Sequence, residues 1–259
     1  MGWKGIAIGG SLGSLFGGPL GAILGAALGH KVEEHLSGGG SSQARSRSIP
    51  PQRRSFVFCA SAAAMLAKLA KADGRVTSDE IASVEAAFHR LGFSQSTRKL
   101  AIDSFRRAKD DSHTIYEYAR DFAAAVDSVD VRELFYELLW DLACADGVVG
   151  PEELQMLRQI PRALRIRGEW FSFFASRRLR SGADERPAAD SLADAYATLG
   201  ASPSDGADEL RRKYRDLAKR NHPDALRAQG LPEEMVGKAT ARMSRINEAW
   251  AEVRAARGI

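Results

Sequence analysis

Cysteine is scarce in this sequence of 259 residues. Only Cys59 and Cys144 occur, and both lie in apolar stretches that read as helices. We therefore expect buried free thiols and not a disulfide framework, which is typical of a protein in a reducing compartment. Because the sequence contains no CxxC pair, no zinc ribbon is predicted.

Recognisable catalytic motifs are also missing. There is no nucleophile elbow, no phosphate-binding glycine-rich loop and no metalloprotease histidine pair. The five histidines show no spacing that is typical of metal ligands. We therefore predict no catalytic residue, no metal site and no cofactor, and we do not expect an enzyme.

Length and composition leave room for more than one domain. A chain of this length can hold two domains and their linkers, and the hydrophobic content of 44% is ample for their cores. The net charge of +4 is mild.

The most apolar part of the chain is its N-terminal run, residues 5–29, which contains no charged residue. About 20 residues suffice for a helix to cross a bilayer, so we predict a single membrane helix with Trp3 at the interface and a kink at Pro19. Glycine recurs at every fourth position and forms a stripe on which a second backbone could pack closely, as in a homodimer. The stripe consists of Gly5, Gly9, Gly13, Gly17, Gly21, Gly25 and Gly29.

Basic residues predict the orientation of this helix. Lys4 alone precedes the run, whereas Lys31, Arg45, Arg47, Arg53 and Arg54 follow it. The positive-inside rule therefore places the bulk of the chain in the cytoplasm. Two alternatives remain: a signal peptide cleaved near residues 27–29, or a glycine-rich segment that inserts only partly or oligomerises on the surface.

A linker and a helical region follow. Residues 37–54 are rich in Gly, Ser, Arg and Pro, which indicates a flexible linker. From Ser55 to about Leu179 nearly everything has helical period, and a motif recurs with an offset of 73 residues, from Ala72 to Ala145. Each copy has an apolar helix before it and an amphipathic helix after it. The expected helices are 56–72, 78–91, 94–107, 114–126, 131–145, 151–164 and 169–178.

The C-terminal segment carries the most informative motif, His222, Pro223 and Asp224. The tripeptide separates a basic amphipathic helix, residues 208–221, from a second amphipathic stretch, residues 233–253. Proline ends the first helix, so His222 and Asp224 are expected to face water at the tip of a helical hairpin. A short helix over 191–199 precedes them, and Ser204 is expected to cap the basic helix.

Residues 190–259 resemble the J domain of the DnaJ-like co-chaperones. Besides the tripeptide, the resemblance rests on residues in and directly after the three predicted helices, namely Tyr196, Leu199, Gly200, Leu210, Tyr214, Leu217, Ala218, Ile246, Asn247 and Ala249. It implies that the chain docks on a DnaK-type chaperone and that His222, Pro223 and Asp224 stimulate ATP hydrolysis by that partner. The implied docking residues, which would face an acidic surface of the partner, are Arg211, Arg212, Tyr214, Arg215, Lys219 and Arg220. Ala225 departs from the family, which often carries a basic residue after the tripeptide.

The middle region resembles the TerB-like domain of tellurite-resistance proteins, on residues 71–74 and 143–147. A membrane segment, a TerB-like domain and a C-terminal J domain, in this order, resemble the DjlA group of membrane-anchored DnaJ-like proteins, which implies a bacterial-type inner membrane. We expect an all-α fold, with a membrane anchor (1–36), a linker (37–54), a TerB-like domain (55–180), a second linker (181–189) and a J domain (190–259).

Other functions stay open at this point. The acidic residues beside the two Asp-Gly motifs could hold a hard cation, although helix capping explains them equally simply. The main alternative is therefore a membrane-bound stress- or metal-response scaffold that acts through its TerB-like domain. Nucleic acid is not an expected partner, because Asp208, Glu209 and Asp216 interrupt the basic helix. The client protein cannot be identified from the sequence.

Overall fold

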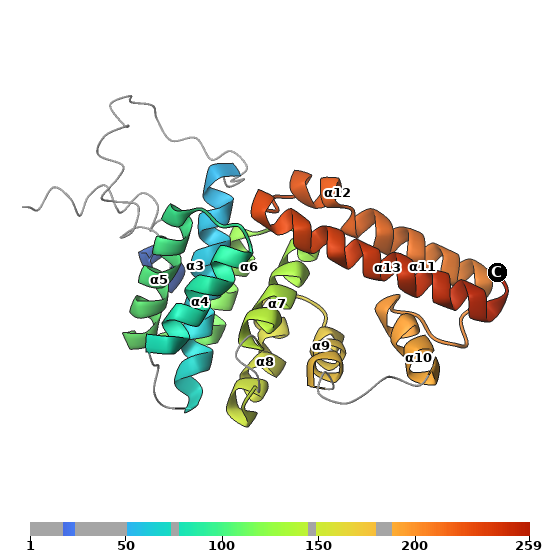
Figure 1. Ribbon diagram of the computed structural model, residues 1–259, viewed down its shortest axis with the longest axis horizontal. Helices are drawn as coiled ribbons and strands as arrows, with labels where there is room; N and C mark the ends of the chain where they lie inside the picture. The colour runs from blue at the N-terminus through green and yellow to red at the C-terminus, as the bar shows by residue number, and fades with distance from the viewer. Residues whose placement is uncertain (1–17, 24–50, 74–77, 145–148, 180–187) are drawn as a thin grey trace, which may run out of the picture. The chain divides into compact units, whose positions relative to one another are not determined.

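The computed structural model describes residues 18–23, 51–73, 78–144, 149–179 and 188–259 (Figure 1). All the regular structure in these ranges is helical, which confirms the predicted all-α fold. The chain forms two compact units, residues 1–168 and residues 169–259.

The first unit is a helical bundle. Its helices are close to the ranges that the hydrophobic periodicity predicts. They are α3 (Pro51–Ala70), the 3-10 helix η2 (Lys71–Asp73), α4 (Ser78–Arg90), α5 (Gln95–Asp110), α6 (Ile115–Ala125), α7 (Val129–Ala143) and α8 (Pro151–Ala163).

Helix α3 forms the centre of this bundle and packs against α5, α6 and α7. Its residues 57–69 are all buried, which explains why this stretch is apolar on every side. Phe58 meets Phe122 of α6 edge-on at 5.1 Å between ring centroids, and Phe122 stacks on Phe135 of α7 at 3.8 Å. Such aromatic pairs stabilise a core beyond the area that they bury.

Side chains at the helix starts fix several boundaries of the bundle. Ser94 and Ser128 accept hydrogen bonds from the backbone of the first turns of α5 and α7. Thr114 and Glu117 form a reciprocal capping box at the start of α6. These caps satisfy backbone N–H groups that a helix leaves without an internal partner.

The second unit contains α9 (Glu169–Leu179), α10 (Ala188–Thr198), α11 (Ala207–Asn221), α12 (Pro223–Ala228), the 3-10 helix η3 (Glu233–Met235) and α13 (Val236–Arg257). The guanidinium of Arg242 in α13 lies over the Trp170 ring of α9, 4.6 Å from its centroid. Its contacts group α9 with the second unit.

A small hydrophobic core holds α10, α11 and α13 together. It includes apolar positions that the sequence predicts on each helix. Beside it, Tyr214 stacks on Trp250 at 4.9 Å between ring centroids, with an angle of 8° between the rings. The buried core residues are Ala195, Tyr196, Leu199, Leu210, Ile246, Ala249 and Val253.

Two local features differ from the expectation. The predicted cap of α11 at Ser204 is wrong: the residue before α11 is Gly206. The carboxylate of Asp205 accepts a hydrogen bond from the Ser202 backbone and forms an ion pair with Lys213 at 2.5 Å, so a turn forms first and the helix begins later. The second feature is α12, a short helix that the sequence analysis did not predict.

Several predicted features lie outside the described residues. These are the turns of the internal repeat at 74–77 and 145–148, most of the linker at 37–54, most of the linker at 181–189, and every glycine of the N-terminal stripe except Gly21. Within the part of the chain that the structure describes, no helix combines the length and apolar character needed to cross a membrane.

Candidate functional site

His222, Pro223 and Asp224 form the junction between α11 and α12. His222 has extended backbone angles, φ −62° and ψ 130°, and it ends α11 and caps α12 at once. Pro223 is the first residue of α12, a position where proline costs nothing because that N–H has no partner within the helix. The tripeptide is therefore the beginning of a helix and has a defined backbone.

The side chains on this junction are presented to solvent. The exposed fraction is 57% for the His222 side chain and 74% for Asp224, which confirms that both face water. The Asp224 backbone N–H donates to Nδ1 of His222 at 3.3 Å, and the same nitrogen lies 3.8 Å from the Asp224 carboxylate. The hydrogen bond to Nδ1 turns the imidazole toward the first turn of α12.

Asn221 anchors the end of α11 immediately before the junction. It is 1% exposed, and its Nδ2 donates to the Leu217 carbonyl at 2.8 Å. A buried side chain that binds the last turn of its own helix leaves little freedom in the direction of the next residue. The residue before His222 is therefore held by burial and by a hydrogen bond within its own helix.

Arg227 is a functional candidate that the sequence analysis missed. Its guanidinium lies 2.8 Å from the Asp224 carboxylate and 3.0 Å from the carboxylate of Glu233 in η3. These partners, Glu233 first, raise the pKa of Arg227. Arg227 thus connects Asp224 to the next element of the fold. The sequence does contain a sign of this pair: Arg227 follows Asp224 by three residues, a spacing that places both side chains on one face of a helix.

The predicted docking residues lie along α11. Arg211, Arg212, Arg215 and Lys219 are exposed, and Arg220 is half-buried. Two of these charges are already paired within the helix, Arg211 with Asp208 at 3.1 Å and Arg212 with Glu209 at 3.5 Å. Arg215 and Lys219, which lie nearer to His222 along the helix, are both exposed.

Tyr214 differs from the other predicted docking residues. Its ring belongs to the stack with Trp250, and its hydroxyl donates to Oδ1 of Asn247 at 3.1 Å. This side chain joins α11 to α13. Tyr214 therefore has a structural role within the domain, whether or not it also contacts the partner.

The described residues show no cluster of three or more His, Cys, Asp or Glu side chains that could hold a metal ion. Of the glycine stripe, the structure describes Gly21 alone, which is buried.

Three family models match the chain. Residues 1–46 match the transmembrane domain of the co-chaperone DjlA, residues 60–174 the tellurite resistance protein TerB, and residues 194–255 the DnaJ domain. These matches confirm the three resemblances that the sequence motifs indicated, and the DjlA match shows that the chain is membrane-anchored.

Relatives extend over nearly the whole chain. The co-chaperone protein DjlA of Photobacterium profundum is 31% identical over 89% of this chain and 90% of its own length. DjlA of Vibrio cholerae is 32% identical over 86% and 83%, and DjlA of Coxiella burnetii 30% identical over the full length of both. No solved structure matches the chain. Identity of this extent shows that the chain belongs to the DjlA family of J-domain co-chaperones.

Proposed function

We propose that this protein is a membrane-anchored co-chaperone that stimulates ATP hydrolysis by a DnaK-type chaperone and recruits that chaperone to the membrane. The observation that carries the proposal is the junction at His222, Pro223 and Asp224. Its side chains are exposed, whereas its backbone is fixed by the start of α12 and by the buried Asn221. A partner can therefore contact a preorganised group, which lowers the entropic cost of binding.

The charge distribution on α11 supports the same proposal. Arg215 and Lys219 are exposed on the helix that leads to His222. A cationic face accelerates the encounter with an acidic partner surface, and this contribution decreases as salt increases. We propose the basic residues of α11 as the docking surface and the tripeptide as the group that triggers hydrolysis.

The N-terminal run supplies the membrane attachment in this proposal. It crosses the membrane once, with the bulk of the chain in the cytoplasm, as the basic residues on its C-terminal side indicate. The glycine stripe would provide a homodimer contact within the bilayer. The proposed division of the chain is anchor 1–36, linker 37–54, TerB-like domain 55–180, linker 181–189 and J domain 190–259.

Recruitment can be tested with the full chain in phosphatidylcholine–phosphatidylglycerol vesicles. A DnaK-type chaperone with ATP is expected to float with vesicles that carry the wild type and not with vesicles that carry His222→Gln. His89→Gln, the same change at an exposed histidine of α4, is the matched control and should leave flotation unchanged. Equal flotation with wild type and His222→Gln would contradict the proposal.

A further inference from the structure

A short segment of the N-terminal apolar run is packed on the helical bundle. Residues 19–23 form a helical turn, and the Ala22 backbone N–H donates to the Gly18 carbonyl at 3.2 Å. Pro19, Leu20, Gly21 and Ile23 are buried, with Leu20 0% and Ile23 4% exposed. This segment lies within the residues that match the DjlA transmembrane domain.

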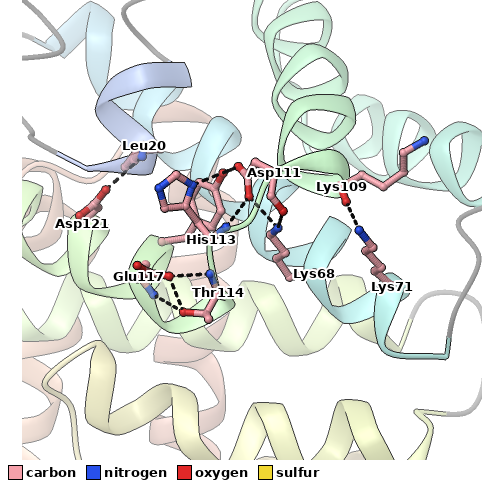
Figure 2. Close-up of polar contacts among 10 residues, drawn as sticks. Leu20, Lys68, Lys71, Lys109, Asp111, His113, Thr114, Glu117 and Asp121 are labelled. Carbon is pink, nitrogen blue, oxygen red and sulfur yellow. Dashed lines mark hydrogen bonds and ion pairs between the residues drawn. The ribbon is translucent and has the colours of Figure 1, made fainter.

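Asp121 of α6 provides a polar anchor for this turn. Its Oδ2 accepts a hydrogen bond from the Leu20 backbone N–H at 3.0 Å (Figure 2). The N–H groups in the first turn of a helix have no partner within that helix, and a side-chain carboxylate is a preferred acceptor for them. Asp121 acts as this cap although it lies 101 residues further along the chain.

Gly18 fits the same contact closely. Its φ is +93°, which residues with a side chain rarely adopt, and a Cβ at this position would lie 2.7 Å from Oδ2 of Asp121. Glycine therefore allows both the backbone turn and the approach of the carboxylate. The sequence Gly18-Pro19 also ensures that the helical turn begins at this point, because proline is favoured as a first helical residue.

Contact with the segment leaves the carboxylate of Asp121 partly buried. Burial raises the pKa of Asp121, and the hydrogen bond from Leu20 offsets this only in part. A carboxylate is more stable in water than in a partly buried position, so release of the segment would restore its hydration. Docking is thus favoured by apolar burial and opposed by desolvation of Asp121.

We propose that the bundle surface around Asp121 is a docking site for residues 18–23 of the same chain. The site is filled while the N-terminal run is out of the bilayer, and it is vacated when the run inserts. The two positions exclude each other, because a segment held against a capping carboxylate of α6 cannot also lie in the hydrocarbon core. The docked state shields part of the membrane segment from water before insertion.

The distance between a label on the segment and a label on α6 tests this proposal. The full chain would carry spin labels at Ala22→Cys and Ala124→Cys, both exposed positions, in a Cys59→Ala, Cys144→Ser background. Pulsed electron resonance in detergent-free buffer is expected to give a short, narrow distance distribution. In phosphatidylcholine–phosphatidylglycerol vesicles this component should decrease several-fold.

Variants at the contact separate docking from chance proximity. Asp121→Ala should remove most of the short-distance component in buffer, whereas Asp110→Ala, at a carboxylate that is 74% exposed at the end of α5, should retain it. Gly18→Ala should also remove the short-distance component. Its effect should be smaller in the Asp121→Ala background, because the two changes act on one contact. Circular dichroism confirms that each variant is folded.

Three results would overturn the proposal. They are the absence of the short distance from the wild type in buffer, its persistence at full amplitude in vesicles, and equal amplitudes in the wild type and Asp121→Ala.

Discussion

The ammonium of Lys68 in α3 lies 2.7 Å from a carboxylate oxygen of Asp111 and 3.0 Å from the Asp111 carbonyl (Figure 2). Asp111 ends α5, so this pair fixes the turn between α5 and α6 to the central helix of the bundle. The hydroxyl of Tyr118 and the backbone N–H of His113 also donate to the same carboxylate. One acidic side chain therefore organises the corner where three helices meet.

Asp111→Asn is expected to destabilise the bundle by about 1–3 kcal/mol, because it removes the charge that pairs with the nearly buried Lys68. Asp110→Asn is the matched control, because the carboxylate of Asp110, the neighbouring residue, is 74% exposed. This change should lower the free energy of unfolding by less than about 0.5 kcal/mol. The midpoint of chemical denaturation, followed by the fluorescence of the buried Trp140, measures both changes. Equal midpoints for the two variants would contradict the role assigned to Asp111.

The contribution of Asp111 is expected to depend on pH. Burial alone would raise its pKa, but the hydrogen bonds from Lys68, Tyr118 and His113 outweigh burial and hold the pKa below its ordinary value. For an acid with a lowered pKa, the stabilisation is fully present above the unfolded value of about 3.9 and is lost as the pH falls through the folded value. The stability difference between wild type and Asp111→Asn should therefore shrink below about pH 4. A difference that stays constant from neutral pH down to pH 3 in denaturation curves would exclude this linkage.

Arg227→Gln is expected to lower the stimulation of a DnaK-type chaperone several-fold while the J domain stays folded. The change releases Asp224 and Glu233 from their shared partner, and surface ion pairs contribute little to stability. Arg254→Gln removes the same charge from an exposed position near the end of α13 and serves as the control. If both variants stimulate like the wild type in an ATPase assay, Arg227 has no part in holding Asp224 for the partner.

The basic face of α11 should act mainly through the rate of association. Arg215→Ala together with Lys219→Ala is expected to slow binding of the partner chaperone several-fold at low salt, with a smaller effect at high salt, because ions screen exposed charges. Stopped-flow binding across a salt series measures this dependence. An effect of the same size at every salt concentration would indicate lost packing and not lost steering.

Most of the helical framework could be predicted from the sequence. The apolar positions of α10, α11 and α13 recur with helical period, and the same residues form the core of the second unit. Local sequence also showed that proline ends α11 and exposes His222 and Asp224. These features depend on neighbours in the chain, which a single sequence displays directly.

Contacts between distant residues could not be predicted in the same way. Lys68 and Asp111 are 43 residues apart, and Leu20 and Asp121 are 101 apart, and no periodic pattern relates them. The cap at Ser204 was predicted wrongly because Asp205 is engaged by Lys213, eight residues further along. α12 was missed because its six residues are too few to show a helical period.

Single-turnover ATP hydrolysis by a DnaK-type chaperone tests the central claim most directly. The reaction would contain the full chain in lipid nanodiscs, as wild type, His222→Gln or the His89→Gln control. The account predicts clear stimulation by wild type and His89→Gln, and hydrolysis at the basal rate with folded His222→Gln. Basal hydrolysis with the folded wild type, or equal stimulation by wild type and His222→Gln, would contradict the claim and direct attention to the TerB-like domain.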